Sequence, residues 1–517
     1  MSDIKIYFPA NKTETEVKEG DTLLDAARAA GLKIDATCSG QGTCGMCKVL
    51  VNGKERLACE TPAEDGMRVE LLSSDEGHVI LTESIKTEEW QQDTGDGSMI
   101  TQGDGSFVLA NTKEPSPCVV SFAIDIGTTT VVIKAIDKDT GKEIDVRAFT
   151  NPQRVYGADV ISRINNAMDD AAELSGIITE AIDREIKNIL RDLQPPPASE
   201  KVVIAANTTM TYLLLNHRCR SLGLVPFEPE YRIDPVYEYQ KIFGADTLSC
   251  PVLIYPYISA FVGGDIVSGL VNVERHLERE GTSSYMLIDM GTNGEIAYRN
   301  GERLLTTSTA AGPALEGGNI TCGMSGLPGA IYAAEYEGGK FTVRTIANKP
   351  PKGICGSGVI SLVACLLDAG IVSETGAFTE DVKELMIANA DEDIVFTQKD
   401  VREFQLAKGA IRAGIDILIE EMGQAPEKLY LAGGFGQNID IDSAFRTGLI
   451  PEGMRGCIVL VGNTSLGGCV DACAEGGPEG PLPSLDITAS AHEINLGAHK
   501  SFSDKFMETM MFDDKKG

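Results

Sequence analysis

The sequence repeats one short pattern at two places far apart in the chain. FAIDIGTTTVVIKAI occupies residues 122–136, and MLIDMGTNGEIAYRN occupies residues 286–300. Each copy is an apolar strand, an Asp, a turn that contains Gly and Thr, and a second apolar strand. Because internal repeats expose architecture, two such hairpins roughly 160 residues apart predict a duplicated, two-lobed α/β fold.

Both turns have the composition of a phosphate-binding site. Glycine lets the backbone approach a ligand, and successive N–H groups in a tight turn form a concave anion site. Asp125 and Asp289 end the first strands and are expected near Mg²⁺, which prefers one or two carboxylates plus phosphate oxygens. The residues expected to hold phosphates are Gly127, Thr128, Thr129, Gly291, Thr292 and Asn293. A P-loop motif and a strand-linked dinucleotide fingerprint are both absent from the sequence, so the pattern indicates neither of those classes.

Four cysteines stand close together near the N-terminus, in ATCSGQGTCGMCKVLVNGKERLAC. A structural zinc site typically uses two Cys-x-x-Cys pairs, and this stretch contains one. A 2Fe–2S cluster of plant type uses three cysteines on one loop and a fourth further along, and the glycines here allow a loop to wrap it. We therefore expect Cys38, Cys44, Cys47 and Cys59 to hold a 2Fe–2S cluster. Their spacing departs from the plant pattern, which leaves the redox potential open.

The pattern along the chain predicts five segments. Residues 1–74 predict a β-grasp unit, with strands at 4–9, 13–19, 47–51 and 67–72 and a short helix capped by Asp21 or Thr22. An acidic linker is expected at 75–117. The first lobe segment is expected at 118–197, with one long helical stretch over 159–193, and a larger second region at 198–500. The tail is 501–517.

Composition limits the partners. The formal net charge is −31, and no basic stripe is visible, so a nucleic-acid partner is not expected. No apolar run approaches the roughly 18 residues that a membrane helix requires. The N-terminus shows no basic segment followed by an apolar stretch, so we expect a cytoplasmic protein without a membrane partner.

AIDIGTTT, LIDMGTNGE and LAGGFG (431–436) resemble the phosphate-1, phosphate-2 and adenosine motifs of the actin, sugar-kinase and heat-shock-chaperone ATPases. The resemblance implies that Gly433, Gly434 and Phe435 lie near the adenosine of ATP. Asp159, in YGADVISRI, is expected to position an attacking water. The alternative for Asp159 is an acidic residue that the helix dipole favours at a helix N-terminus.

The whole chain resembles the reductive activators of corrinoid enzymes, and AANTTMTYLLL (205–215) and STAAGPALEGGNITCGM (308–324) resemble that family's own segments. The resemblance implies an α+β β-grasp ferredoxin domain joined by a linker to a duplicated two-lobed α/β ATPase-like fold. Its implied activity is ATP-dependent return of cob(II)amide to cob(I)amide on a methyl-carrying corrinoid protein. The implied cofactors are a 2Fe–2S cluster, ATP and Mg²⁺. The implied partners are the corrinoid protein, a low-potential donor such as ferredoxin or flavodoxin, and a second copy in a homodimer.

Three other functions stay open from the sequence. One is a small-molecule kinase with a fused ferredoxin redox sensor, and another is an electron-transfer module whose nucleotide-like region serves for docking. The third is the activator class of 2-hydroxyacyl-CoA dehydratases, whose 4Fe–4S cluster lies between subunits and does not match this N-terminal ligand set. The loop at 308–329 faces either the corrinoid partner or the phosphates, or its glycines serve ordinary packing.

Overall fold

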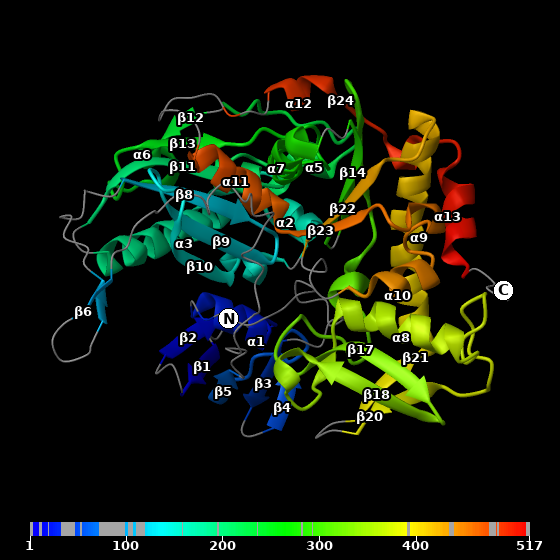
Figure 1. Ribbon diagram of the computed structural model, residues 1–517. Coiled ribbons are helices and arrows are strands. Elements are labelled where there is room, and N and C mark those ends of the chain that lie inside the picture. The colour runs from blue at the N-terminus through cyan, green and yellow to red at the C-terminus, as the bar shows by residue number, and fades with distance from the viewer. Residues whose placement is uncertain are drawn as a thin grey trace.

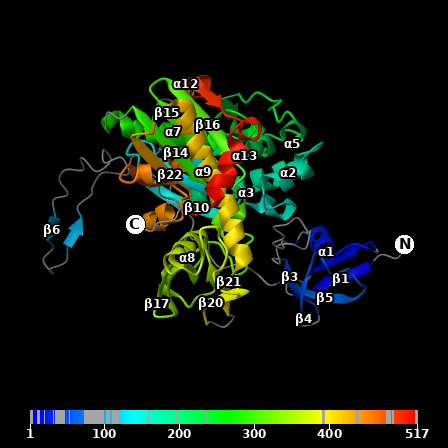
Figure 2. The ribbon, with the colours of Figure 1, turned by 90° about the vertical axis from the view of Figure 1, so that its right-hand side faces the viewer.

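The computed structural model contains a small β-grasp domain followed by two larger lobes (Figure 1). It describes residues 4–9, 13–18, 20–30, 32, 47–51, 54–71, 99–101, 107–109, 119–157, 159–193, 196–234, 236–280, 283–291, 293–389, 393–433, 439–474, 482 and 485–512. In Figure 2 the β-grasp domain, drawn in blue, lies to one side of the lobes.

The β-grasp domain has a five-stranded sheet in the order β2-β1-β5-β3-β4, in which β1 and β5 are parallel. Its elements are β1 (Ile4–Phe8), β2 (Thr13–Val17), α1 (Leu23–Ala29), β3 (Lys48–Val51), β4 (Lys54–Leu57) and β5 (Met67–Leu71). Thr22 begins the helix, because its hydroxyl accepts from the Asp25 N–H while its own N–H donates to the Asp25 carboxylate. Apart from β4, which the sequence did not predict, these elements match the expected order. Lys54–Leu57 is mostly polar, and its pairing with β3 defines it as a strand.

Most of the expected linker lies outside the described residues. Within it, β6 (Met99–Thr101) and β7 (Phe107–Leu109) form an antiparallel pair.

The first lobe is built on a six-stranded sheet in the order β10-β9-β8-β11-β13-β12. Its strands are β8 (Val119–Ile126), β9 (Thr130–Asp137), β10 (Glu143–Thr150), β11 (Ala198–Ala206), β12 (Val236–Glu238) and β13 (Pro251–Ile254). Its helices are α2 (Val160–Asn166), α3 (Ala172–Asp192), α4 (Thr208–Leu214), α5 (Arg220–Gly223), α6 (Tyr239–Phe243) and α7 (Gly264–Glu280). Because β11 pairs with β8 along its length, this sheet continues across the boundary expected at 197/198, and the lobe extends to the region of residue 280.

The helical stretch expected over 159–193 is interrupted. α2 ends at Asn166, and α3 begins anew at Ala172, whose N–H donates to the Asp170 carboxylate at 2.9 Å. Asn166 also donates its side-chain amide to the Ser162 carbonyl oxygen at 2.9 Å. Asn and Asp compete with the helix for backbone bonds in this way, so the predicted helical stretch forms two helices with a break at 167–171.

The second lobe repeats the arrangement of the first. Its sheet has the order β23-β22-β14-β15-β16-β24, and its strands are β14 (Ser284–Met290), β15 (Gly294–Asn300), β16 (Arg303–Thr309), β22 (Lys428–Ala432), β23 (Ile458–Gly462) and β24 (Ala491–Glu493). In both sheets an antiparallel three-strand meander is followed by two strands added in parallel to its first strand. The expected duplication is therefore present in the topology as well as in the sequence.

Further elements extend the second lobe. A small sheet is formed by β17 (Ala330–Glu337), β18 (Lys340–Thr345) and β19 (Gly353–Ile354), and a pair by β20 (Glu384–Ala388) and β21 (Ile394–Thr397). The helices are η3 (Pro313–Glu316), α8 (Gly356–Asp368), α9 (Gln398–Met422), α10 (Ile441–Arg446), α11 (Thr464–Ala474), α12 (Leu485–Ser490) and α13 (Phe502–Met510). In the expected tail, α13 lies along α9 (Figures 1 and 2).

The helices α7 and α11 lie between the two sheets, and each contacts the lobe that the other half of the chain forms. α7 follows the first sheet in sequence, yet its Glu274 carboxylate accepts from the Tyr285 hydroxyl of β14 at 2.7 Å. α11 follows the second sheet, yet it packs on β8, β9 and β11 of the first. A side-chain carbon at Gly468 would lie 2.0 Å from the Ser268 carbonyl oxygen, so the two helices touch at their backbones. The apolar residues of both helices and both sheets form one core.

Candidate functional site

The phosphate-1 turn joins β8 to β9 and is held by donors from three other elements. The Gly127 N–H donates to the Thr130 carbonyl oxygen at 2.9 Å, and the Asn151 amide donates to the Gly127 carbonyl oxygen at 2.8 Å. The Asn207 amide donates to the Thr128 hydroxyl at 3.1 Å. These bonds fix the turn before any ligand binds, which lowers the entropy cost of binding.

A buried guanidinium supports the same turn. Arg163 of α2 is fully buried and donates to the Thr128 and Gly157 carbonyl oxygens. Burial, with a smaller effect of Arg154, lowers its pKa to about 9. The guanidinium thus places positive charge behind the phosphate-1 turn.

The phosphate-2 turn joins β14 to β15. Its loop is one residue shorter than that of the phosphate-1 turn, because Met290 pairs with Gly294 whereas Ile126 pairs with Val131. The Gly291 N–H donates to the Asn293 carbonyl oxygen at 2.9 Å. Thr292, which was also predicted to bind phosphate, lies outside the described residues. A side-chain carbon at Gly291 would lie 3.7 Å from Glu316 Oε1, so η3 brings Glu316 beside the turn. The start of the loop at 308–329 therefore faces the phosphate side of the fold.

Asp125, the carboxylate of the first hairpin, is bonded through both of its oxygens. Asn463 Nδ2 donates to Oδ2 at 2.8 Å, and Ser465 Oγ donates to Oδ1 at 2.9 Å. Burial raises the pKa of Asp125, and these two hydrogen bonds act in the opposite direction. Both donors come from the N-terminus of α11, more than three hundred residues later in the chain.

Asp289, the carboxylate of the second hairpin, faces other carboxylates. Burial raises its pKa to about 7, and the charges of Asp265, Asp125 and Glu316 add to the effect. Burial also raises the pKa of Asp265, in the first turn of α7, to about 7. The side chains of both Asp289 and Asp265 are half-buried, so water and ions reach them.

Glu295 on β15 lies directly across the ladder from Asp289. Its pKa is raised well above the ordinary value, first by burial and then by Asp265 and Asp289, while a hydrogen bond from Asn293 opposes the rise. Sequence reasoning missed both Asp265 and Glu295. Glu295 carried a signal, because the aligned residue of the first copy is Val131. Asp265 followed a glycine pair at the start of a helical pattern, which alone predicts no site.

The glycine turn after β22 comes close to this group. Gly433 has a φ of +90°, and a side-chain carbon there would lie 2.7 Å from Asp289 Oδ1. Only glycine fits both conditions without strain. Gly434 and Phe435 lie outside the described residues. Gly433, the first glycine of the predicted adenosine motif, thus lies next to Asp289.

The carboxylates fit Mg²⁺ held mainly by phosphates and water. Within the described ranges, no three His, Cys, Asp or Glu side chains are gathered closely enough to hold a metal by themselves. Mg²⁺ keeps several waters and needs only one or two carboxylates beside substrate phosphates. Asp289, whose pKa is raised by burial and then by neighbouring negative charge, is the residue best suited to that role. A bound cation would relieve the repulsion among these groups.

Asp159 occupies a different environment. It is the N-cap of α2, and its two carboxylate oxygens accept from the Ser162 N–H and hydroxyl, each at 2.8 Å. This is a helix N-terminal role, the alternative that the sequence left open. The predicted role of Asp159 toward water stays a prediction.

The β-grasp domain brings two of the predicted cluster ligands together. Cys47 directly precedes β3 and Cys59 follows β4, so the β3–β4 hairpin places both buried thiols side by side, with their sulfurs 3.1 Å apart. That separation is too long for a disulfide bond, which measures about 2.05 Å. Cys38 and Cys44 lie outside the described residues. Two adjacent buried thiols fit ligation of an iron–sulfur cluster.

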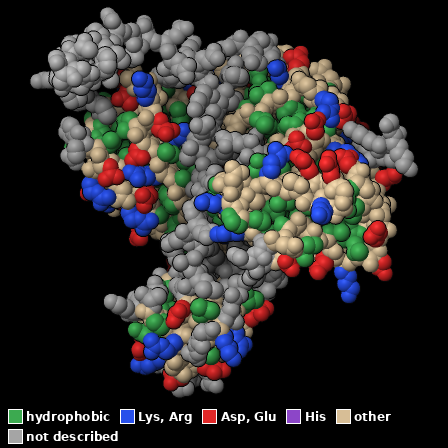
Figure 3. Space-filling model, turned by 60° about the horizontal axis from the view of Figure 1, so that its bottom comes forward, with side chains coloured by type: hydrophobic (Ala, Val, Ile, Leu, Met, Phe, Trp, Pro, Cys, Tyr) green, Lys and Arg blue, Asp and Glu red, His purple; other side chains and the backbone are tan. Residues whose placement is uncertain are grey.

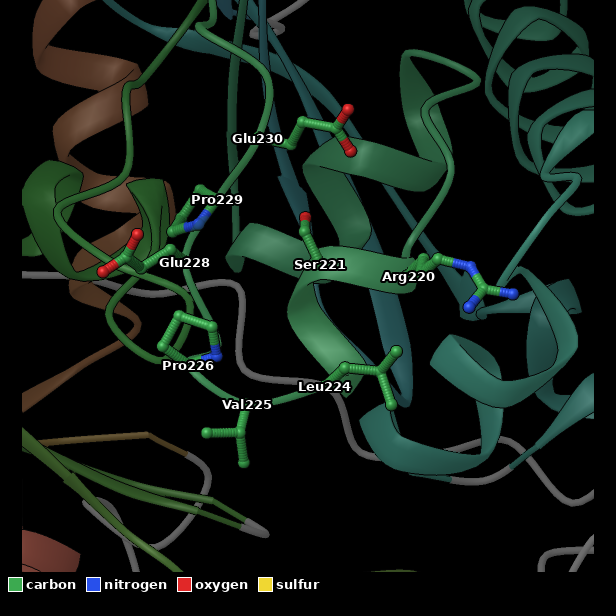
Figure 4. Close-up of a pocket in the computed structure, with 8 residues that line it drawn as sticks. All are labelled: Arg220, Ser221, Leu224, Val225, Pro226, Glu228, Pro229 and Glu230. Atoms are coloured by element: carbon green, nitrogen blue, oxygen red, sulfur yellow. The ribbon is translucent and has the colours of Figure 1, made fainter.

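One depression on the described part of the surface lies apart from the carboxylates around Asp289. A shallow depression of about 400 Å³ lies beside α5 and is lined by Arg220, Ser221, Leu224, Val225, Pro226, Glu228, Pro229 and Glu230 (Figure 4). The carboxylates near Asp289 do not line it. On the face drawn in Figure 3, Lys and Arg side chains are mixed with Asp and Glu and form no continuous stripe over the coloured residues. None of the described helices is long and apolar enough to cross a membrane.

Comparison with known proteins follows this division of the chain. Residues 8–70 match the family described as 2Fe-2S iron-sulfur cluster binding domain. Residues 120–278 match the RACo middle region, and residues 283–517 match the C-terminal domain of RACo, the ASKHA domain.

Relatives that match most or all of the chain have names that refer to corrinoid proteins. The corrinoid activation enzyme RamQ of Eubacterium limosum is 28% identical over 99% of both chains. A solved structure of a reductive activator for corrinoid, iron-sulfur protein has a TM-score of 0.68 and 26% identity over 98% of each chain. The [Co(II) methylated amine-specific corrinoid protein] reductase of Methanosarcina barkeri is 30% identical, over 67% of this chain and 68% of its own. The chain belongs to the family of reductive activators of corrinoid proteins. In this activator the predicted 2Fe–2S domain and the predicted ATPase-like fold are therefore both confirmed.

Proposed function

We propose that this activator passes one electron from its 2Fe–2S cluster to the cob(II)amide of a methyl-carrying corrinoid protein, which returns it to cob(I)amide, and that ATP drives the transfer. One observation carries the proposal. A single chain holds two adjacent buried thiols in a 2Fe–2S domain and, in its lobes, two phosphate-type hairpins with carboxylates between them. A chain that contains both an electron carrier and a nucleotide-binding site is suited to a reduction that is thermodynamically unfavourable by itself.

The energetics explain why a nucleotide is needed. The cluster supplies the electron when bound, and clusters of plant type have potentials near about −400 mV. Moving one electron to an acceptor roughly 100 mV lower costs about 2.3 kcal/mol. Tighter binding of the cob(II) state, followed by an ATP-dependent change of the complex, is able to offset that cost.

Different residues of the proposed nucleotide site bind the phosphates, hold the metal ion and orient water. In the proposed site the two turns hold the phosphates: the Gly127 and Gly291 N–H groups close the turns, and the N–H groups of Thr128, Thr129 and Asn293 would bind the phosphate oxygens. Asp289 holds the water shell of Mg²⁺, and Asp265 faces it from α7. Asp265 is a second candidate, beside Asp159, for orienting an attacking water: its Oδ1 accepts from the Ile266 N–H at 2.8 Å, and both oxygens of Asp159 accept bonds from Ser162.

The proposal also includes partners. The relatives' names point to a corrinoid protein as the acceptor. A low-potential carrier such as ferredoxin or flavodoxin loads the cluster, and the activator works as a homodimer. Size measurement in solution tests the last point, since a monomer at all concentrations would contradict it.

The function is tested anaerobically. Reduced activator, a corrinoid protein in the cob(II)amide state and Mg·ATP are mixed, and the cob(I)amide absorption band is followed. We expect the band with ATP and its loss without ATP, with Cys59→Ser as the cluster-deficient control. Equal reduction without ATP would favour a plain electron-transfer module. Phosphorylation of a metabolite with no cob(I)amide band would favour a kinase with a redox sensor.

A further inference from the structure

The carboxylate of Asp125 is held by residues from the far end of the chain. Asn463 and Ser465 donate to its two oxygens, so each oxygen has one strong donor. Hydrogen bonds to a carboxylate are among the stronger ones in proteins, worth about twice a neutral bond. Asp125 is therefore fixed in orientation by α11, which belongs to the other lobe by sequence.

Asn463 is itself fixed. Its side-chain oxygen accepts from the Leu466 N–H at 2.8 Å, which is the bond of a helix N-cap. With the oxygen used in this way, the amide nitrogen has to point away from the helix, toward Asp125 Oδ2. One side chain thus starts α11 and binds the carboxylate.

α11 is tied to the first lobe and to α7 next to these donors. α7 packs along α11 over much of its length. The Tyr255 hydroxyl donates to the Gly468 carbonyl oxygen at 3.0 Å. Since α11 packs rigidly against β8 and α7, its N-terminus sets the position of the carboxylate instead of following it.

Position matters because Asp125 lies among like charges. Its charge raises the pKa of both Asp265 and Asp289. Without donors, a desolvated carboxylate in that company would turn away or take up a proton. The two donors hold the Asp125 carboxylate in one orientation and act against the rise in its pKa that burial causes.

We propose that Asn463 and Ser465 are positioning residues of the nucleotide site, which hold Asp125 toward the metal-bound phosphates and link the start of α11 to nucleotide binding. The inference rests on the proposed binding of Mg·nucleotide between the lobes. It assigns no direct contact with the nucleotide to either residue.

Two substitutions test the inference in the full-length protein. Ser465→Ala removes one donor. Asn463→Asp retains an N-cap residue but places a like charge against Asp125. Ser268→Ala is the matched control, because it also removes a hydrogen bond at α11 but leaves both donors to Asp125 in place.

ADP affinity is measured calorimetrically with excess Mg²⁺ and again with EDTA. We expect a loss of Mg²⁺-dependent affinity of about fivefold for Ser465→Ala and about thirtyfold for Asn463→Asp, because charge-assisted bonds are strong. Affinity in EDTA should change less than twofold, and Ser268→Ala should bind like wild type. If Asn463→Asp does not fold, Ser465→Ala decides alone.

The outcomes are distinct. Wild-type metal dependence in both variants would overturn the inference while leaving the proposed function intact. An equal loss in Ser268→Ala would also overturn it, because general packing would then explain the effect. Failure of the wild type to bind Mg·ADP at all would overturn the proposed function together with the inference.

Discussion

Asp125 and Asp289 occupy the same position in two copies of one hairpin, at the ends of β8 and β14, but their surroundings differ. Asp125 has a donor for each oxygen from α11. Asp289 is surrounded by the negative charges of Asp265, Asp125 and Glu316. A repeated sequence therefore yields one carboxylate with a protein donor for each oxygen and one among negative charges, for which we propose a cation.

The strands beside the two carboxylates show the same difference. The residue across the ladder from Asp125 is Val132, which is buried in the core between the lobes. The residue across from Asp289 is Glu295. Like charges in that position destabilise a sheet unless a proton or a cation compensates. The second hairpin is therefore expected to be less stable at this pair of residues than the first.

The largest effect should separate the two Asp residues directly. We expect Asp289→Asn to lower ATP turnover on the order of a hundredfold, and Asp125→Asn about tenfold, because asparagine still offers an oxygen to one of the two donors. Steady-state ATPase assays measure both. Equal losses would remove the distinction between the hairpins.

A substitution at Gly433 tests how closely the adenosine segment approaches the second carboxylate. We expect Gly433→Ala to lower the free energy of unfolding by about 1–3 kcal/mol, because alanine is strained at this backbone angle and its Cβ meets Asp289 Oδ1. Urea unfolding measures the change. Gly453→Ala is the control, since a side-chain carbon there meets nothing within 4 Å. If Gly433→Ala were as stable as Gly453→Ala, then position 433 would lie farther from Asp289 Oδ1 than the structure indicates.

The pH dependence of stability should come from the second hairpin. The folded pKa values of Asp289 and Asp265 are about 7, above the unfolded value near 3.9. The folded state therefore binds these protons more tightly, and stability falls as pH rises from about 4 through 7. We expect Asp289→Asn to gain about 1–2 kcal/mol over wild type at pH 8 without metal, since solvent access reduces the full linkage value.

Thermal unfolding of the metal-free protein at pH 4.5 and pH 8 checks this gain. Little difference between Asp289→Asn and wild type is expected at pH 4.5. Added Mg·ADP should remove most of the wild type's loss at pH 8. The expected sign would be contradicted if raising the pH from 4.5 to 8 stabilised the wild type more than it stabilised Asp289→Asn.

The smallest effect should come from the cross-strand pair. We expect Glu295→Gln to raise the free energy of unfolding by about 0.5 kcal/mol at pH 8 without metal, because it removes a like charge opposite Asp289. Glu384→Gln, at an exposed position on β20, should change it little. Destabilisation by Glu295→Gln would mean that its bond with Asn293 outweighs the repulsion.

The sequence predicted those parts that rest on local pattern. The repeated Asp-Gly-Thr hairpins predicted both lobes, because period-two strands around a glycine turn have few alternatives. The cysteine spacing predicted the cluster domain, which the family match confirms. Asp159 was harder, because a residue that starts a helix and a residue that orients a water look alike in sequence.

The remaining features depend on contacts between distant residues. Nothing near Asp125 in sequence indicates that Asn463 and Ser465 bind it. Asp265 is recognisable as a candidate site residue only because the fold brings Asp125 of β8 and Asp289 of β14 near it. β4 forms because β3 offers it a partner, and its own residues give no strand signal. Pairing across long separations follows from packing, which local periodicity does not encode.

The packing of α11 on the first sheet ties the two halves of the chain into one folding unit. α11 comes from the second half of the chain, yet it covers apolar residues of β8 and β11. A chain that ended before α11 would leave those residues exposed to water, which costs free energy. The first lobe is therefore expected to reach its full stability only after the second lobe has been synthesised.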